Sequence, residues 1–254
     1  MPSHLIFEKA EKLFTGILFK ETKKYTTFTY YTSYFKEPWW NWIVPNCSPE
    51  NLDEYSLNKL LKTEKMLNRQ NCFYINQSQQ TEYQSYLHSK GYTESDSDFY
   101  LGLKLTKKFI VPDAEIQELN DSNIKDQILL ADGVFGDDFD SKGYTELFEY
   151  NHKKNITDKH FHNLLLYKNG LPVAFGFLIV DKKDNIAYLH NAATHPAHRR
   201  KGYFDTLVKY RCNLAFDHGV KNVFAIVQKE GASYNNYLKL GFKEKDTFFT
   251  YTKK

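Results

Sequence analysis

The chain has 254 residues, of which 41% are hydrophobic and 26% are charged, a balance that is typical of folded proteins and excludes long disordered stretches. The 34 basic and 31 acidic residues leave a formal net charge of +3, so the bulk charge gives no reason to expect binding to nucleic acid or to a membrane. The length allows one large domain or two modest ones.

Cysteine usage and the N-terminal segment indicate the compartment. Cys47, Cys72 and Cys212 are far apart and form no Cys-x-x-Cys pair, which argues against a disulfide framework. No basic segment followed by a long apolar run opens the chain, and no apolar stretch approaches the roughly 20 residues of a membrane-spanning helix. We therefore expect a soluble protein of the cytoplasm.

The N-terminal third has few clear elements. Residues 25–34 are rich in aromatic residues and threonine, which predicts a strand, and residues 52–67 have a helical pattern. The tryptophans 39, 40 and 42 either pack in a core or line a binding cleft. A strand is expected at 99–105, and a domain boundary after it divides the chain into residues 1–106 and 107–254.

From residue 107 onwards, apolar runs of strand length alternate with helical patterns, as expected of an α/β domain. Asn169-Gly170 is a strong signal for a hairpin turn between two of the strands. In chain order we expect helices at 124–135 and 144–152, strands at 161–167, 172–180 and 186–193, a helix at 204–218, a strand at 223–227, a helix at 232–240 and a strand at 242–251.

Two short segments of the N-terminal third resemble segments near the end of the chain. Residues 71–77 match residues 222–228 at Asn, Phe, Ile and Gln, an offset of 151 residues, and Gly91-Tyr92 parallels Gly241-Phe242 at an offset of 150. Two interpretations remain open: a tandem of two related domains, or a chance recurrence of a common pattern. In the first case the N-terminal copy is degenerate, because it lacks a basic, glycine-containing turn like the one at residues 198–203. We then expect it to shape the binding site of a second substrate, the acceptor, instead.

A basic turn stands between an expected strand and an expected helix. It reads His198-Arg199-Arg200-Lys201-Gly202-Tyr203 and follows a proline-marked turn at Pro196. Such a turn can direct backbone N–H groups and the positive end of the helix at one point, which suits a phosphate or pyrophosphate. The alternative is a solvated, basic helix start.

This arrangement resembles the GNAT superfamily of N-acetyltransferases, whose acyl-CoA motif is Arg/Gln-x-x-Gly-x-Gly/Ala. The match here is Arg199-x-x-Gly202-x-Phe204, with Phe204 in place of the last small residue. A second segment, residues 237–242, reads Tyr-Leu-Lys-Leu-Gly-Phe and looks like the family's Tyr-x-Lys-Leu-Gly-Phe. Together with the order of elements, the resemblance covers about 150 residues.

The resemblance implies a GNAT-like mixed sheet flanked by helices and the transfer of an acetyl group from acetyl-CoA to a primary amine of a small molecule or peptide. No metal is implied. The residues that would then contact the cofactor are Ala192, Ala193, Thr194, Arg199, Arg200, Lys201, Gly202, Tyr203, Phe204 and Ser233.

The resemblance also implies two catalytic candidates. Tyr237 stands where the family has a general acid, and a tyrosine, with a pKa near 10, can protonate the leaving thiolate. The attacking amine must be neutral, which requires a base or a water chain. His190 is the candidate base because histidine titrates near neutrality, whereas Tyr188 and Asn191 are neighbours that could hold a water instead. Either candidate has a structural alternative as a core side chain.

Other classes of function remain in view. Because Phe204 departs from the motif, a non-catalytic acyl-CoA-binding regulatory module is the main alternative. A nucleic-acid binder that uses the basic turn is weaker, given the small net charge. His160-x-His162 lacks a third ligand at a recognisable spacing, so no metal site is expected. The acceptor and the oligomeric state are not determined by the sequence.

Overall fold

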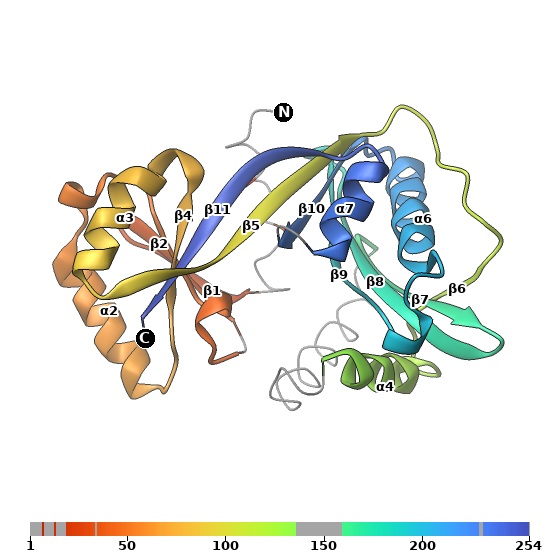
Figure 1. Ribbon diagram of the computed structural model, residues 1–254, viewed down its shortest axis with the longest axis horizontal. Helices are drawn as coiled ribbons and strands as arrows, with labels where there is room; N and C mark the ends of the chain where they lie inside the picture. The colour runs from red at the N-terminus through yellow and green to blue at the C-terminus, as the bar shows by residue number, and fades with distance from the viewer. Residues whose placement is uncertain are drawn as a thin grey trace. The chain divides into compact units, whose positions relative to one another are not determined.

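The computed structural model describes Phe7, Leu13 and residues 19–33, 35–135, 159–228 and 231–253 (Figure 1). Contacts divide the chain into two compact units. Unit 1 comprises Met1–Tyr100, Val227–Tyr234 and Glu244–Lys254, and unit 2 comprises Leu101–Ile226 and Asn235–Lys243. This division differs from a single boundary near residue 106, because the last strand of the chain packs within unit 1. The domain boundary between residues 106 and 107 stays a prediction.

Unit 1 is a sheet with helices on one face. Its elements are β1 (Phe19–Lys24), β2 (Phe28–Ser33), β3 (Trp42–Pro45), α2 (Glu54–Met66), β4 (Cys72–Asn76), α3 (Gln80–Ser89), the start of β5 (Tyr92–Lys104) and β11 (Lys243–Lys253), with short 3-10 turns at Pro38–Trp40, Pro49–Asn51 and Gln77–Gln79. Strands β1, β2 and β3 pair antiparallel in that order, β3 and β4 pair parallel, and β4 pairs antiparallel with β11. The strand expected at 25–34 begins only at Phe28, because residues 25–27 form the connection after β1.

Helices α2 and α3 cover the same face of this sheet, since Leu57, Leu60, Tyr83 and Leu87 join one core with residues of β2, β3 and β4 (Figure 1). Aromatic stacking adds to the packing in unit 1. The ring of Trp42 stacks on Tyr74 with centroids 4.0 Å apart, and only 5% of Trp42 is exposed. For Trp42, therefore, the core-packing alternative holds.

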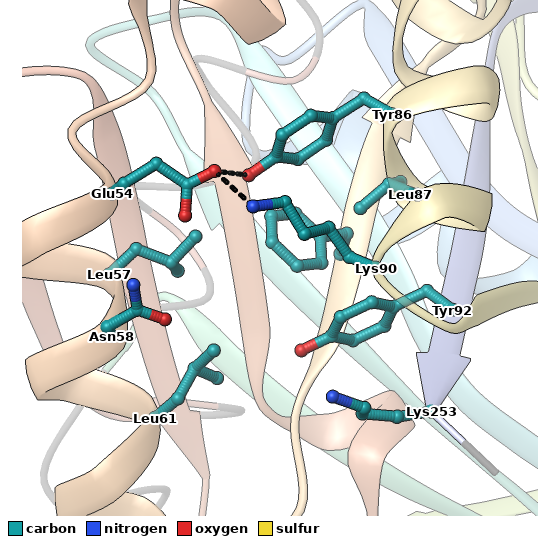
Figure 2. Close-up of a pocket in the computed structure, with 10 residues that line it drawn as sticks. Glu54, Leu57, Asn58, Leu61, Tyr86, Leu87, Lys90, Tyr92 and Lys253 are labelled. Carbon is teal, nitrogen blue, oxygen red and sulfur yellow. Dashed lines mark hydrogen bonds and ion pairs between the residues drawn. The ribbon is translucent and has the colours of Figure 1, made fainter.

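Unit 1 has a small pocket of about 90 Å³, lined by side chains of α2 and α3 and of the neighbouring strands. Figure 2 shows the lining side chains. At one end, Glu54 accepts a 2.6 Å hydrogen bond from the Tyr86 hydroxyl and forms a 2.8 Å ion pair with Lys90. Leu57 and Leu61 supply apolar lining from α2. Because the carboxylate and the ammonium at this end neutralise each other, the pair supplies no surplus positive charge for an anion.

Unit 2 contains the end of β5, β6 (Glu115–Glu118), α4 (Ile124–Phe135), β7 (Phe161–Lys168), β8 (Leu171–Asp181), β9 (Ile186–Thr194), a 3-10 turn at Pro196–His198, α6 (Tyr203–Asp217), most of β10 (Asn222–Gln228) and the later part of α7 (Ala232–Lys239). Strands β6 to β9 pair antiparallel in chain order, and β9 pairs parallel with β10. Helices α4 and α6 both contact β8.

The local predictions for unit 2 agree closely with these elements. Asn169 and Gly170 form the hairpin turn with φ angles of 53° and 73°, the left-handed backbone that a two-residue turn between twisted strands requires. Helix α6 ends just before Gly219, whose φ is 83°. The expected helix at 144–152 lies outside the described residues. Strand β6 is an addition that the sequence pattern did not predict.

The same order of elements occurs twice along the chain. The series β1-β2-β3-α2-β4-α3-β5 corresponds to β7-β8-β9-α6-β10-α7-β11, and in each series the second and third strands are antiparallel while the third and fourth are parallel. The glycines after α3 and α7, Gly91 and Gly241, have φ angles of 81° and 93°. These parallels favour the tandem interpretation over chance recurrence.

Across the ranges that the structure covers, no helix is both long and apolar enough to cross a membrane.

Candidate cofactor-binding turn and active site

The basic turn connects β9 to α6 and is held by two of its own side chains. Arg199 Nε donates to the backbone oxygen of Thr194 at 3.2 Å, and Lys201 Nζ donates to that of Ala197 at 3.2 Å. Arg199, Arg200 and Lys201 are all exposed. Arg200 and Gly202 both have left-handed backbone, with φ of 62° and 81°. The turn thus brings three cationic side chains to the start of a helix.

The N-terminus of α6 has no side-chain cap. Gly202 occupies the N-cap position without a side chain to accept from the helix, and the first helical hydrogen bond runs from Thr206 N to Gly202 O at 3.0 Å. The N–H groups of the first turn, which include those of Tyr203 and Phe204, therefore have no acceptor within the helix. A Cβ at Gly202 would meet no atom within 4 Å, so this glycine serves the backbone conformation and leaves open space above it.

Strand β9 carries an irregularity just before the turn. Phe177 of β8 lies opposite His190, whereas Phe175 lies opposite Ala193, so Asn191 and Ala192 together face a single residue of β8. Asn191 has a φ of 41°. An extra residue of this kind is a β-bulge, which re-aims the backbone groups of the bulged strand.

On its other edge, β9 pairs with β10 only as far as Tyr188, opposite Phe224. From Leu189 onwards this edge does not continue the β9–β10 pairing. Main-chain groups of Ala192, Ala193 and Thr194 follow in this stretch, where Ala193 is buried and the other two are partly exposed. The hydroxyl oxygen of Thr194 is buried without a hydrogen-bond partner among the described residues.

Tyr237 lies in α7 and is 3% exposed. Its ring meets that of Phe204 edge to face at a centroid distance of 5.5 Å and that of Phe242 at 4.9 Å. Burial raises the pKa of the Tyr237 hydroxyl, and the nearby Arg211 guanidinium partly opposes this rise. The phenol is therefore protonated at neutral pH, the state that a proton donor needs. Ser233 lies in the first turn of the same helix, within unit 1.

His190 is 8% exposed, and its Nδ1 lies 3.1 Å from the Tyr188 hydroxyl. Burial, and secondly the charge of Arg211, lower the pKa of His190 to about 3. An imidazole with so low a pKa takes up a proton poorly at neutral pH. This environment argues against His190 as the base and fits a core histidine, while its assignment as base stays a prediction.

Sequence reasoning missed Arg211, which is 0% exposed in α6 and influences both catalytic candidates. The signal was present, since an arginine occupied the apolar stripe of the helix, four residues after Leu207.

Among the residues that can be described, no group of three or more His, Cys, Asp or Glu is arranged to hold a metal ion. His162 instead contacts Glu118 at 2.7 Å and His218 at 2.9 Å.

Comparison with known proteins agrees with this geometry. The sequence model of the acetyltransferase (GNAT) family matches residues 129–242. A GCN5-related N-acetyltransferase from Sphaerobacter thermophilus is similar in structure with a TM-score of 0.67 and 10% identity, covering 97% of this chain and 84% of that one. A GCN5-related N-acetyltransferase from Kribbella flavida has a TM-score of 0.64 and 13% identity, covering 100% and 95%.

A tandem GNAT protein from the clavulanic acid biosynthesis pathway is also similar, with a TM-score of 0.60 and 11% identity, covering 89% of this chain and 77% of that one. At such identities the structural likeness shows the fold alone. A search of curated protein sequences finds no match.

The mixed sheet flanked by helices and the order of its strands define an α/β protein with the GNAT fold. Residues 129–242 match the sequence model of the GNAT acetyltransferase family, and the structural likeness over the rest of the chain is one of fold.

Proposed function

We propose that this protein is an N-acetyltransferase that moves the acetyl group of acetyl-CoA to a primary amine of a small molecule or peptide. The observation that carries the proposal is the uncapped start of the 15-residue helix α6 at Gly202, directly after three exposed cationic side chains. The match of residues 129–242 to the family's sequence model supports the same assignment. The free, widely spaced cysteines suit a reducing cytoplasm.

The turn is suited to the diphosphate of the cofactor. Backbone N–H groups of the first turn of α6 and the positive end of its dipole favour an anion. The exposed side chains of Arg199, Arg200 and Lys201 add long-range attraction for the phosphates. Beyond the bulge, main-chain groups of Ala192, Ala193 and Thr194 are the candidates for the pantetheine arm, because β9 no longer pairs with β10 there.

The transfer itself needs little from side chains. The lone pair of a neutral amine forms the new C–N bond at the thioester carbon, the C–S bond breaks, and the sulfur leaves with the electron pair. The proposed role of Tyr237 is to give its hydroxyl proton to that sulfur, which burial keeps available. The proton lost by the amine passes to solvent through water rather than to His190, whose pKa is too low.

Unit 1 contrasts with unit 2 at the matching helix. Asp53 caps the N-terminus of α2 by accepting from Ser56 N at 3.1 Å. The Ser56 side chain, and secondly this backbone hydrogen bond, lower the pKa of the Asp53 carboxyl. Each helix also has one carboxylate in its first turn, Glu54 in α2 and Asp205 in α6, but only the α6 turn is preceded by three exposed cationic side chains. A capped and negatively charged helix start repels a pyrophosphate. We therefore assign cofactor binding to unit 2 and regard unit 1 as a degenerate copy.

Release of free thiol from acetyl-CoA, measured against a panel of amines and amino acids, tests the proposal. We expect at least one amine to accelerate release and to be recovered with an added acetyl group. Binding of CoA measured by calorimetry separates the alternatives. If CoA binds and no amine on a broad panel accelerates thiol release, the non-catalytic regulatory module replaces the enzyme.

A further inference from the structure

Helix α6 buries an entire arginine. Arg211 is 0% exposed, and its Nη1 donates to the backbone oxygen of Phe177 at 2.9 Å and to that of His190 at 3.3 Å. Its Nε donates to Leu207 O, one turn earlier, at 3.3 Å. Among the residues that the structure describes, no carboxylate forms an ion pair with this guanidinium, and Nη2 is buried without a hydrogen-bond partner.

Such a placement is costly, because a buried charge requires compensation that backbone carbonyls supply only in part. The fold nevertheless makes room for it. A Cβ added at Gly176 of β8 would lie 2.9 Å from Arg211 Cζ, closer than real contacts allow, and 3.0 Å from Nη1. A glycine in the middle of a strand is itself unfavourable. Two unfavourable residues, Gly176 and Arg211, are thus matched to each other.

The two carbonyls that accept from Nη1 belong to residues directly opposite each other. Phe177 and His190 form the last regular pair of β8 and β9 before the bulge, and Gly176 faces the bulged residues Asn191 and Ala192. One nitrogen therefore ties the two strands together at the point where their register shifts. The β9 backbone that follows is the stretch assigned above to the pantetheine arm.

The same guanidinium affects the proposed proton donor. Burial raises the pKa of the Tyr237 hydroxyl, and the positive charge of Arg211 acts in the opposite direction by favouring the phenolate. A positive charge beside a buried phenol makes it a stronger acid when the proton leaves. Arg211 therefore binds the pair of carbonyls directly before the β9 bulge, and its charge acts on Tyr237.

We propose that Arg211 is a positioning residue of the acetyl-transfer site, which fixes the β9 bulge through two backbone carbonyls and supplies the positive charge that assists Tyr237 as proton donor. The inference rests on the proposed function for its catalytic half. The structural half, the clamp on the bulge, stands without it.

Three variants test the inference in the full chain. Arg211→Met keeps a long side chain and removes the charge. Arg211→Lys keeps the charge and removes the guanidinium with its several N–H donors, and Gly176→Ala forces the guanidinium to move. Lys209→Met on the same helix is the matched control, because Lys209 is partly exposed and has no role in either site. Amide hydrogen exchange of residues 191–194 and the pH profile of acetyl-CoA turnover are the readouts.

For Arg211→Met we expect faster exchange at residues 191–194, a fall in kcat on the order of tenfold or more, and a shift of the alkaline limb of kcat to higher pH. The shift follows because removal of the cation leaves only burial acting on the pKa of Tyr237, which then rises further. Arg211→Lys should restore the position of the alkaline limb and only part of the exchange protection. Lys209→Met should leave all readouts unchanged.

A folded Arg211→Met protein with unchanged exchange at residues 191–194 and an unchanged alkaline limb overturns the proposal. If Arg211→Met does not fold, Gly176→Ala decides, since it keeps the charge and must still show faster exchange at the bulge. If the unaltered protein turns over no acyl-CoA with any amine, the proposed function fails, and the exchange measurement alone still accepts or rejects the clamp.

Discussion

The ring of Phe204 meets the ring of Tyr237 edge to face, with centroids 5.5 Å apart and an interplanar angle of 82°. Phe204 lies in the first turn of α6, where the acyl-CoA motif has a small residue, and Tyr237 is the candidate proton donor. The departure from the motif therefore has a structural partner. It joins the proposed phosphate turn to the proposed acid through one aromatic contact.

Replacement of Phe204 by Ala tests this link. We expect the protein to lose about 1–3 kcal/mol of stability, because a half-buried ring and one aromatic pair disappear. We also expect kcat to fall while CoA affinity stays the same or improves, since the helix start becomes less crowded. Denaturant unfolding, thiol release and calorimetry provide the three measurements. In each measurement Phe204→Leu, which keeps an apolar side chain without the aromatic ring, should lie between the unaltered protein and Phe204→Ala. Weaker CoA binding in Phe204→Ala would show that the ring itself contacts the cofactor.

The assignment of Gly202 to the phosphate turn has a matched control within one helix. Gly202 and Gly219 flank α6 with φ angles of 81° and 83°, and a Cβ at either would meet no atom within 4 Å. Gly202→Ala and Gly219→Ala should each cost about 1 kcal/mol of stability for the left-handed backbone. Only Gly202→Ala should weaken CoA binding, by roughly tenfold or more, because the new methyl group lies where the phosphates approach. Equal CoA affinities for the two variants would remove the turn from the site.

Substitution of Tyr237 by Phe removes the hydroxyl group, and with it the proposed proton donor, while it keeps the ring. The contacts with Phe204 and Phe242 are between rings, so they persist, and both stability and CoA affinity should change little. Turnover should fall by on the order of a hundredfold or more, as expected when a general acid is lost. Comparison of kcat with the Kd for CoA makes the measurement. Unchanged turnover would assign Tyr237 to the core alone.

His190 should influence stability more than catalysis. Its folded-state pKa is about 3, whereas a histidine in the unfolded chain has a pKa of about 6.5. Between these values the unfolded state binds the proton and the folded state does not, so His190 makes the protein lose stability as the pH falls from 6.5 towards 3. Above pH 6.5 this contribution is absent.

Unfolding free energies of the unaltered protein and of His190→Gln, followed from pH 7 to pH 4, test this expectation. The variant should lose less stability over the range, and His88→Gln, at an exposed position, should follow the unaltered protein. Turnover of His190→Gln should remain within about tenfold of the original. A much larger loss of kcat, with the fold intact, would return His190 to the role of general base.

Local structure in unit 2 was largely predictable. Asn169-Gly170 and the alternating apolar runs on either side of it define the β7–β8 hairpin, because turn type and strand period are properties of neighbouring residues. Gly219 marked the end of α6 for the same reason. Short strands such as β3 and β6, each of four residues, were missed, since so few residues show no clear period.

The sequence by itself determined the order of strands and helices from β7 to β11, the basic turn at Gly202 and the two motifs that resemble the GNAT family, because each depends on residues within a few positions of one another. Only the tertiary structure decided that β11 pairs with β4, such as Phe248 with Asn76, that Phe204 packs on Tyr237, and that Arg211 is buried against Gly176. Contacts of that kind join residues that are far apart in the sequence, and local periodicity does not predict which surfaces the folded sheet brings together.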